Sequence, residues 1–433
     1  YIKTYIDETN NNLAIMMKRL ILGAASVFLV AAVSLYAQQR NSLTNSPRRL
    51  DAEVSKNNEI TPLDQICPEN FPSLHAVLHD RRPEQVKHYE ETVGHQTWAW
   101  NGKGDDTPEI QVVHNHKFAV WKMFKHYHTE SSAWDIDGYV KGPGWREPIA
   151  PYKPVTELDG DWAAFTSWFH DNYGHFMHDH LSTIAYLKSV VPETTKFMLV
   201  DGVVTRKVIE FIDPEFYKRV MWIQRDQVFH IKGSLTVAVP IAIPITLGCC
   251  GGWEPMRQWL ATTHPVRPKR KTIVFYSRGG SKDTHHGRVI EEKHEQDILD
   301  HVRLAMKMYN RPEELVIFTG QKAGKTMPID EQFNLFRSAH TIIGPHGSGL
   351  GGNFAWTDPF TSSCDERTKL LEFIPGQESA QVQSLYATYF ANLRKWPLDY
   401  HNVLYTKEST PKTTYIDLDS LDDALAEMWG PKP

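Results

Sequence analysis

Polar groups able to transfer protons gather on one side of a predicted helix. The helix is expected from about residue 175 to residue 190, and the groups on this side are His175, His178, Asp179, Ser182 and Tyr186. Imidazole and carboxylate groups exchange protons near neutral pH, and hydroxyls bind ligands through hydrogen bonds. The pattern favours a catalytic or ligand-binding face. The alternatives are an ordinary solvated face and a zinc site, because a histidine and an aspartate one turn apart suit that metal.

A predicted strand over residues 272–276 ends in a basic, glycine-rich segment. Ser277 and Arg278 follow the strand directly, two glycines come next, and Arg288 lies further along. Ligands of open α/β sheets bind at the carboxyl ends of strands, and arginine donates paired hydrogen bonds to phosphate oxygens. We therefore expect Arg278 and Arg288 to hold a diphosphate. The alternative is a surface loop with a solvated arginine.

A third candidate site, the strongest of the three, follows a predicted strand over residues 341–343. The chain then reads HGSGLGGN, a glycine-rich turn that opens a helix. Backbone N–H groups at the start of a helix suit a phosphate group, and a histidine beside them adds a hydrogen-bond donor. A tight structural turn is the alternative, although it requires fewer glycines. The expected site residues are His346, Gly347, Ser348, Gly349 and, at the end of the next strand, Glu372 as a ligand for ribose hydroxyls.

The same residues also satisfy a dinucleotide-binding fingerprint. Gly347, Gly349 and Gly352 have the GxGxxG spacing, and Glu372 follows about twenty residues later. A dehydrogenase opens its nucleotide domain with this fingerprint, whereas two βα units precede it here. A nucleotide-dependent oxidoreductase is therefore the alternative function. Both functions place a nucleotide diphosphate on this helix.

Strand and helix patterns alternate regularly after Pro268. Continuous apolar strands separated by helices predict a parallel sheet covered on both faces, a doubly wound α/β lobe. The strands expected in it are 272–276, 315–318, 341–343 and 369–373, and the helices are 291–309, 330–339 and 349–356. Earlier strands are expected at 110–113, 118–123, 163–169, 196–200, 229–231 and 235–243, with a glycine-rich linker at 244–252 and a last helix at 421–429.

An uncharged run over residues 20–37 stands behind Lys18 and Arg19. It is just long enough to cross a bilayer as a helix, which favours a transmembrane signal anchor over residues 18–37. A cleaved signal peptide is the alternative. Either one sends the chain into the secretory pathway, so we expect a single-pass type II protein of the Golgi or endoplasmic reticulum membrane. The expected parts after the anchor are a stem (38–60), an N-terminal lobe (61–250), a C-terminal lobe (266–400) and a tail with its helix (401–433).

The composition excludes two broad classes of protein. With 41% hydrophobic residues, the chain has enough apolar surface for large cores and is not disordered as a whole. A formal net charge of -5 gives no basis for a nucleic-acid partner. The cysteines form no CxxC pair, which favours disulfides over a cysteine zinc site in an oxidising compartment. These cysteines are Cys67, Cys249, Cys250 and Cys364.

Together these sites resemble glycosyltransferase family 61, which includes plant xylosyl- and arabinosyltransferases and animal lumenal O-linked N-acetylglucosaminyltransferases. The chain departs from the family pattern after Arg288, where an asparagine is absent, and Thr284-His-His286 lengthens the preceding loop. The matching positions are Asn172, Tyr173, His175 and Asp179; Ser277 and Arg278; Glu331-Gln332; the HGSGL run 346–350; and the Glu-x-x-Pro run 372–375.

The resemblance implies a GT-B architecture, in which two Rossmann-like lobes face a cleft. The N-terminal lobe would bind the acceptor and the C-terminal lobe the nucleotide-sugar donor. The implied reaction is an inverting transfer of xylose, arabinose or N-acetylglucosamine from a nucleotide diphosphate, such as a UDP-sugar, to a hydroxyl of a glycan or glycoprotein. No metal or other cofactor is expected.

The implied mechanism divides the site residues between the two lobes. Arg278, His346 and the amides of the glycine-rich turn would stabilise charge on the departing diphosphate. Asp179, or His175 in its place, would remove the proton of the acceptor hydroxyl. A non-catalytic sugar-binding relative is the alternative from a different class.

Overall fold

The computed structural model describes part of the chain, within a compact unit over Ser55–Pro433. The expected anchor, stem and linker, and all four cysteines, lie outside the described residues, so those expectations and the lobe boundaries stay predictions. Within the described ranges, no helix is long and apolar enough to span a membrane. The described residues are 77–79, 109–119, 154–165, 171–224, 227–239, 253–267, 269–279, 289–360, 366–375, 398–407 and 413–430.

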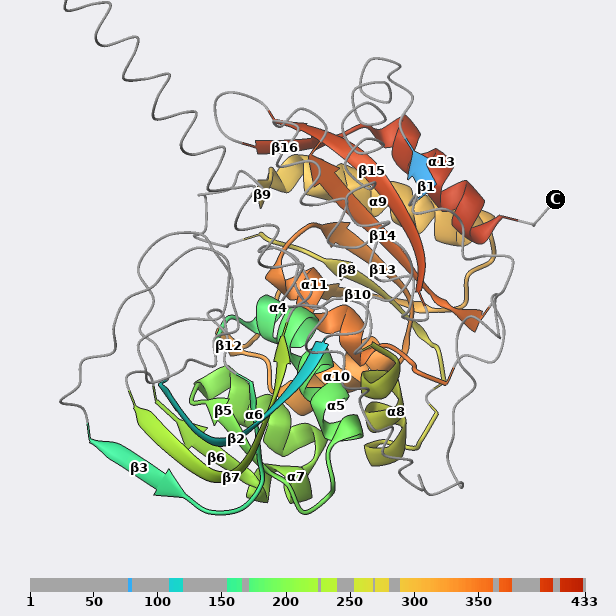
Figure 1. Ribbon diagram of the computed structural model, residues 1–433. Helices are drawn as coiled ribbons and strands as arrows, with labels where there is room; N and C mark the ends of the chain where they lie inside the picture. Colours follow the sequence, from blue (N-terminus) through green and yellow to red (C-terminus); the bar gives the residue numbers. More distant parts are fainter. Residues whose placement is uncertain are drawn as a thin grey trace, which may run out of the picture. The chain divides into compact units, whose positions relative to one another are not determined.

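The first of two large sheets is built from the earlier part of the chain (Figure 1). Its strands run in the order β2-β7-β4-β5-β6, and β3 pairs with β7. All pairs are parallel except β2 with β7. The bounds are β2 Glu109–Ala119, β3 Val155–Leu158, β4 Trp162–Phe165, β5 Lys196–Val200, β6 Val220–Ile223 and β7 Val228–Val239.

One strand replaces two in this sheet. The sequence predicted separate strands at 229–231 and 235–243, whereas β7 runs without interruption from Val228 to Val239. The glycine is needed because a Cβ at Gly233 would lie 2.2 Å from the carbonyl oxygen of Gly160. Ser234 is tied at the same point by its backbone N–H and its hydroxyl, both of which donate to Asp161. The stretch is therefore a close crossing of two chain segments rather than a turn.

Three helices and two strands in this part of the chain, one of them β3, were not predicted. Helix α6 (Val203–Ile212) buries Thr205, Val208, Ile209 and Ile212, a spacing that lines one helical face. Helix α7 (Pro214–Lys218) begins with a proline, and the Asp213 carboxylate caps it by accepting from the Phe216 N–H. The third helix is α8 (Trp253–Thr263), and the other unpredicted strand is β6.

The second large sheet confirms the predicted parallel strands. Its order is β10-β8-β13-β14-β15-β16-β9, and β1 pairs with β15. The run from β10 to β15 is parallel throughout, and β16 is antiparallel to β15. The bounds are β1 Val77–His79, β8 Thr272–Tyr276, β9 Val289–Ile290, β10 Glu314–Phe318, β13 Ala339–Pro345, β14 Thr368–Pro375, β15 Leu398–Lys407 and β16 Thr413–Ile416, with a small separate hairpin of β11 (Gln321–Lys322) and β12 (Lys325–Thr326).

Helices cover both faces of the second sheet, as predicted. Neighbouring residues of one strand, Ile273 and Val274, belong to different buried clusters because strand side chains alternate between faces. Helices α9 (Glu292–Met308) and α13 (Leu418–Trp429) contribute to one cluster. Helix α10 (Ile329–Arg337) and the short helix η5 (Phe354–Trp356) contribute to the other.

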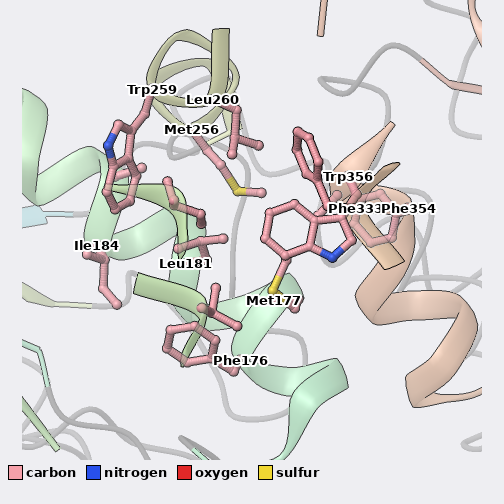
Figure 2. Packing of buried hydrophobic residues seen from close by; sticks show 14 of the residues in the cluster. Phe176, Met177, Leu181, Ile184, Met256, Trp259, Leu260, Phe333, Phe354 and Trp356 are labelled. Atoms are coloured by element: carbon pink, nitrogen blue, oxygen red, sulfur yellow. The ribbon is translucent and has the colours of Figure 1, made fainter. Parts of the chain in front are cut away.

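The cluster beneath α10 and η5 also contains side chains from the first sheet and its helices, so one core joins the two halves. Figure 2 shows Met177 and Met256 from the first half directed toward Trp356 of the second. Phe211 and Phe333 add edge-on ring contacts to Trp356 with centroids 5.9 and 5.5 Å away. The elements that carry the candidate site are held together by this apolar core.

Candidate active site

The helix that carries the expected catalytic base contains a π-helical turn. It consists of α4 (Tyr173–His175), the π segment η3 (Phe176–His180) and α5 (Leu181–Val190). The Leu181 N–H donates to the carbonyl of Phe176, five residues earlier, instead of four. Such a turn inserts one residue into the helix and is found often at functional sites.

The π turn changes which residues share a face. Ser182 was expected on a solvent-accessible polar side with His175, and the structure buries it. The extra residue rotates everything after η3 relative to α4. His175 is half-buried, and the backbone of Asp179 lies within η3. The side chains of His178 and Asp179 lie outside the described part, so Asp179 as the base stays a prediction.

The start of α4 is fixed by two side chains from the loop before it. The Asn172 carboxamide oxygen accepts a hydrogen bond from the His175 N–H at 3.3 Å and caps the helix. Asp171 reaches the other way, and its carboxylate accepts from the Val204 N–H at 2.8 Å, at the beginning of α6. The hydrogen bonds of Asp171 and Asn172 therefore fix the start of the helix that carries His175.

Helix α4 packs tightly against α11 (Ser348–Asn353), the helix opened by the glycine-rich turn (Figure 1). A Cβ at Gly174 would lie 2.8 Å from the Cα of Ser348. The Tyr173 hydroxyl donates to the Asn353 side chain at 2.7 Å and accepts from the Trp356 indole N–H at 2.8 Å. Burial raises the pKa of Tyr173, so the phenol stays protonated. This packing brings together the two sequence regions that were expected to share a site.

The glycines of the turn have packing roles that the sequence did not reveal. A Cβ at Gly349 would lie 2.6 Å from the Tyr276 ring, and one at Gly352 would lie 2.6 Å from the Tyr173 ring. Gly344, on β13, lets the backbone of Tyr276 approach in the same way. Close packing thus accounts for these glycines. A phosphate on the N–H groups of Gly347, Ser348 and Gly349 stays a prediction.

The Ser-Arg pair lies at the carboxyl end of β8, as predicted. The Ser277 hydroxyl donates to the Glu295 carboxylate at 2.8 Å and accepts from the Gly279 N–H at 3.0 Å. Burial raises the pKa of Glu295, and the Ser277 hydrogen bond partly opposes that rise. One guanidinium nitrogen of Arg278, Nη1, donates to the carbonyl of His346 at 3.3 Å. Arg288 lies outside the described residues.

His346 is held by a buried carboxylate. Its Nδ1 lies 2.6 Å from Oε1 of Glu372, and the Tyr400 hydroxyl donates to Oε2 of the same carboxylate at 2.6 Å. Glu372 has no exposed surface, and His346 is 6% exposed. In this position Glu372 contacts His346 and Tyr400, so its expected role as a ribose ligand stays a prediction. Tyr400 was missed because its strand, β15, was not recognised in the sequence.

The contacts of Asn353 and Trp356 with Tyr173 were not expected from the sequence. Asn353 and Trp356 form hydrogen bonds with Tyr173 although they lie 180 and 183 residues away in the sequence.

Within the described ranges, no group of three or more His, Cys, Asp or Glu side chains is arranged to hold a metal ion.

Residues 173–363 match the family model described as Glycosyltransferase 61. The match begins at Tyr173 and includes α4, η3, the Ser277-Arg278 strand end and the glycine-rich turn. This part of the chain belongs to glycosyltransferase family 61. The protein is a glycosyltransferase, which decides against the oxidoreductase suggested by the glycine spacing.

The sequence and structure of this glycosyltransferase were also compared with curated proteins and with solved structures. No curated protein matches its sequence. Among solved structures it is similar to the bacterial iron-containing dodecameric glycosyltransferase TibC from enterotoxigenic E. coli H10407. The identity is 10%, the alignment covers 64% of this chain and 83% of that chain, and the TM-score is 0.27.

Proposed function

We propose that this glycosyltransferase transfers xylose, arabinose or N-acetylglucosamine from a nucleotide diphosphate donor, with inversion, to a hydroxyl of a glycan or glycoprotein. The half of the protein that contains the first sheet binds the acceptor, and the half that contains the second sheet binds the donor in a GT-B arrangement. The nucleotide diphosphate is that of a UDP-sugar, and no metal cofactor is required.

One observation carries the proposal. Arg278, His346 and Gly347 meet at the carboxyl end of the second sheet, where Arg278 donates to the His346 carbonyl and a Cβ at Gly347 would lie 2.8 Å from Arg278 Nη1. This edge is where open α/β sheets bind ligands. A guanidinium beside a histidine suits the negative charge that develops on a departing diphosphate.

The acceptor side is supported by the contact between α4 and α11. Because Gly174 meets Ser348, the helix end that carries His175 lies close to the turn that carries His346. In the proposed step, the acceptor oxygen forms a bond to the anomeric carbon while the bond from that carbon to the diphosphate breaks. Asp179, or His175 in its place, takes the hydroxyl proton, and Arg278 and His346 stabilise the departing diphosphate.

The proposed location is the Golgi or endoplasmic reticulum membrane, with the catalytic part in the lumen. The support is the uncharged run over residues 20–37 behind Lys18 and Arg19. Carbonate extraction of membranes from cells that express the full-length chain checks this point. Recovery of the whole protein in the soluble fraction would contradict a membrane anchor.

A donor screen tests the activity. The purified full-length chain is incubated with UDP-xylose, UDP-arabinose and UDP-N-acetylglucosamine, and release of UDP is measured with and without a mixture of glycan acceptors. We expect release with one donor, stimulation by an acceptor, and activity that survives a metal chelator. The anomeric configuration of the product, read by NMR, tests inversion. Binding of UDP without release from any donor would favour a non-catalytic sugar-nucleotide-binding relative.

A further inference from the structure

Two buried side chains, His346 and Glu372, and the partly buried Tyr400 form a continuous chain of hydrogen bonds behind the glycine-rich turn. His346 follows β13, Glu372 lies on β14 and Tyr400 lies on β15, so three adjacent strands of one sheet supply them. The two contacts, from His346 Nδ1 and from the Tyr400 hydroxyl, are both 2.6 Å and end on the two different oxygens of Glu372.

The sheet register explains why these three groups meet. Tyr400 is the strand partner of Leu370, and Glu372 is two residues further along β14. Residues two apart on a strand face the same side of a sheet, so Tyr400 and Glu372 are diagonal neighbours on one face. His346 N–H donates to the carbonyl of Phe373 at 3.0 Å, which places the histidine beside the carboxyl end of β14. The arrangement is therefore fixed by backbone pairing.

A carboxylate with no exposed surface is costly unless its oxygens accept hydrogen bonds. Glu372 meets this requirement through His346 and Tyr400 together. With Glu372 ionised, the hydrogen atom of the 2.6 Å contact resides on Nδ1 of His346, because a carboxylate only accepts hydrogen bonds. Any hydrogen bond from His346 to a donor substrate then falls to its other ring nitrogen, Nε2.

We propose that Glu372 and Tyr400 are positioning residues that fix the orientation and the protonated nitrogen of the His346 ring. Glu372 keeps the proton on Nδ1, and Tyr400 prevents the carboxylate from rotating away. The effect on turnover rests on the proposed function, in which His346 stabilises the departing diphosphate. The effect on the orientation and protonation of the His346 ring does not depend on the proposed function.

The first experiment measures the ring without any substrate. The full-length chain is labelled with ¹⁵N at histidine, and the His346 signals are assigned by their loss in His346→Gln. We expect Nδ1 to be protonated in the wild type and in Tyr400→Phe, and incompletely protonated in Glu372→Gln. An unprotonated Nδ1 in the wild type, or an unchanged signal in Glu372→Gln, would overturn the proposal.

The second experiment measures turnover with the UDP-sugar that gives UDP release. We expect Glu372→Gln to lower kcat by about tenfold to a hundredfold, the range seen when a partner that orients a functional histidine is removed, with a smaller change in KM. Tyr400→Phe, which retains the contact between Glu372 and His346, should lower kcat less. UDP-binding stoichiometry corrects each rate for the fraction of folded protein.

A double variant separates positioning from general structural damage. If Glu372 acts through His346, then His346→Ala/Glu372→Gln should be no slower than His346→Ala alone. Additive losses would overturn the positioning role, because they would mean that Glu372 acts independently of the ring. If His346→Ala changed neither UDP affinity nor kcat, the proposed function of His346 would fail, whereas the ¹⁵N result would still decide whether Glu372 sets its protonation.

Discussion

Arg278 and Gly347 constrain each other at the candidate donor site. A side chain at residue 347 would begin 2.8 Å from a guanidinium nitrogen, so the arginine in its observed position uses the space that the glycine leaves open. The same guanidinium donates to the carbonyl just before that glycine. Arg278 and the glycine-rich turn therefore depend on each other. Loss of Arg278 removes both a positive charge and a hydrogen bond that supports the turn.

Donor affinity should depend strongly on this arginine. Arg278→Ala should weaken UDP binding by roughly 1.5–3 kcal/mol, the scale of a hydrogen bond to a charged group. Isothermal titration calorimetry measures the affinity, and His346→Ala is measured beside it. Arg303→Ala is the matched control, because Arg303 lies on α9 with an exposed side chain paired to Asp300. Unchanged affinity in both Arg278→Ala and His346→Ala would remove these residues from the donor site.

The catalytic base can be separated from a ligand contact at the same helix. If Asp179 removes the acceptor proton, Asp179→Asn should slow transfer on the order of a hundredfold or more, the range for a positioned general base. UDP affinity should barely change, because the diphosphate is proposed to bind the other half of the protein. Transfer that survives in Asp179→Asn and disappears in His175→Gln would identify His175 as the base.

At the scale of elements, the site depends on how closely α4 and α11 approach. Gly174 faces Ser348, and Gly352 faces the Tyr173 ring, so each helix supplies one glycine to the contact. The buried Tyr173 hydroxyl then joins Asn353 and Trp356 by hydrogen bonds. The contact contains no room for a methyl group, and this is what holds the end of α4 beside the glycine-rich turn.

A methyl group at Gly352 should therefore destabilise the protein. In Gly352→Ala the new Cβ would begin 2.6 Å from the Tyr173 ring, and overpacking of this kind costs about 1–3 kcal/mol. Urea unfolding measures the loss. In a Tyr173→Leu background the ring is absent, so the same substitution should cost less. An equal cost in both backgrounds would show that crowding against Tyr173 is not the cause.

At the scale of the whole molecule, the two ends of the second sheet have different roles. The carboxyl ends of β8, β13 and β14 carry the candidate donor site. Near the amino ends, Asp399 accepts a hydrogen bond from Lys369 at 2.9 Å and lies 3.4 Å from a ring nitrogen of His401. Burial raises the pKa of the Asp399 carboxyl, but the hydrogen bond and charge of His401 and the charge of Lys369 outweigh it and hold the pKa below its ordinary value.

This ionic cluster should set stability without affecting donor binding. A carboxyl whose pKa is lowered in the folded state stabilises the protein above its unfolded value of about 3.9, and the stabilisation is lost as the pH falls further. Asp399→Asn should cost about 1.5–3 kcal/mol at neutral pH, and its stability should fall less than that of the wild type below about pH 4. Urea unfolding at several pH values measures both. A change in UDP affinity in this variant would contradict the separation of roles.

The sequence by itself determined the elements whose pattern is local. Strands 196–200 and 272–276 were predicted at their observed bounds, and helix 291–309 agrees with α9 to within one residue at each end. Continuous apolar strands between amphipathic helices give a recognisable period in any parallel sheet that is covered on both faces. The carboxyl end of β8 and the turn after β13 were identified for the same reason, because strand ends follow from the strands.

Only the tertiary structure decided which of these helices, strands and turns contact one another. No local pattern indicated the π turn before the buried Ser182, the tyrosines that explain Gly349 and Gly352, or the position of Tyr400. Each depends on a partner far away in the sequence, as in the contact between Tyr173 and Trp356 across 183 residues. Hydrophobic periodicity indicates which face of a helix or strand is buried, but not which residues pack against that face. Those partners are determined by close packing in the folded protein.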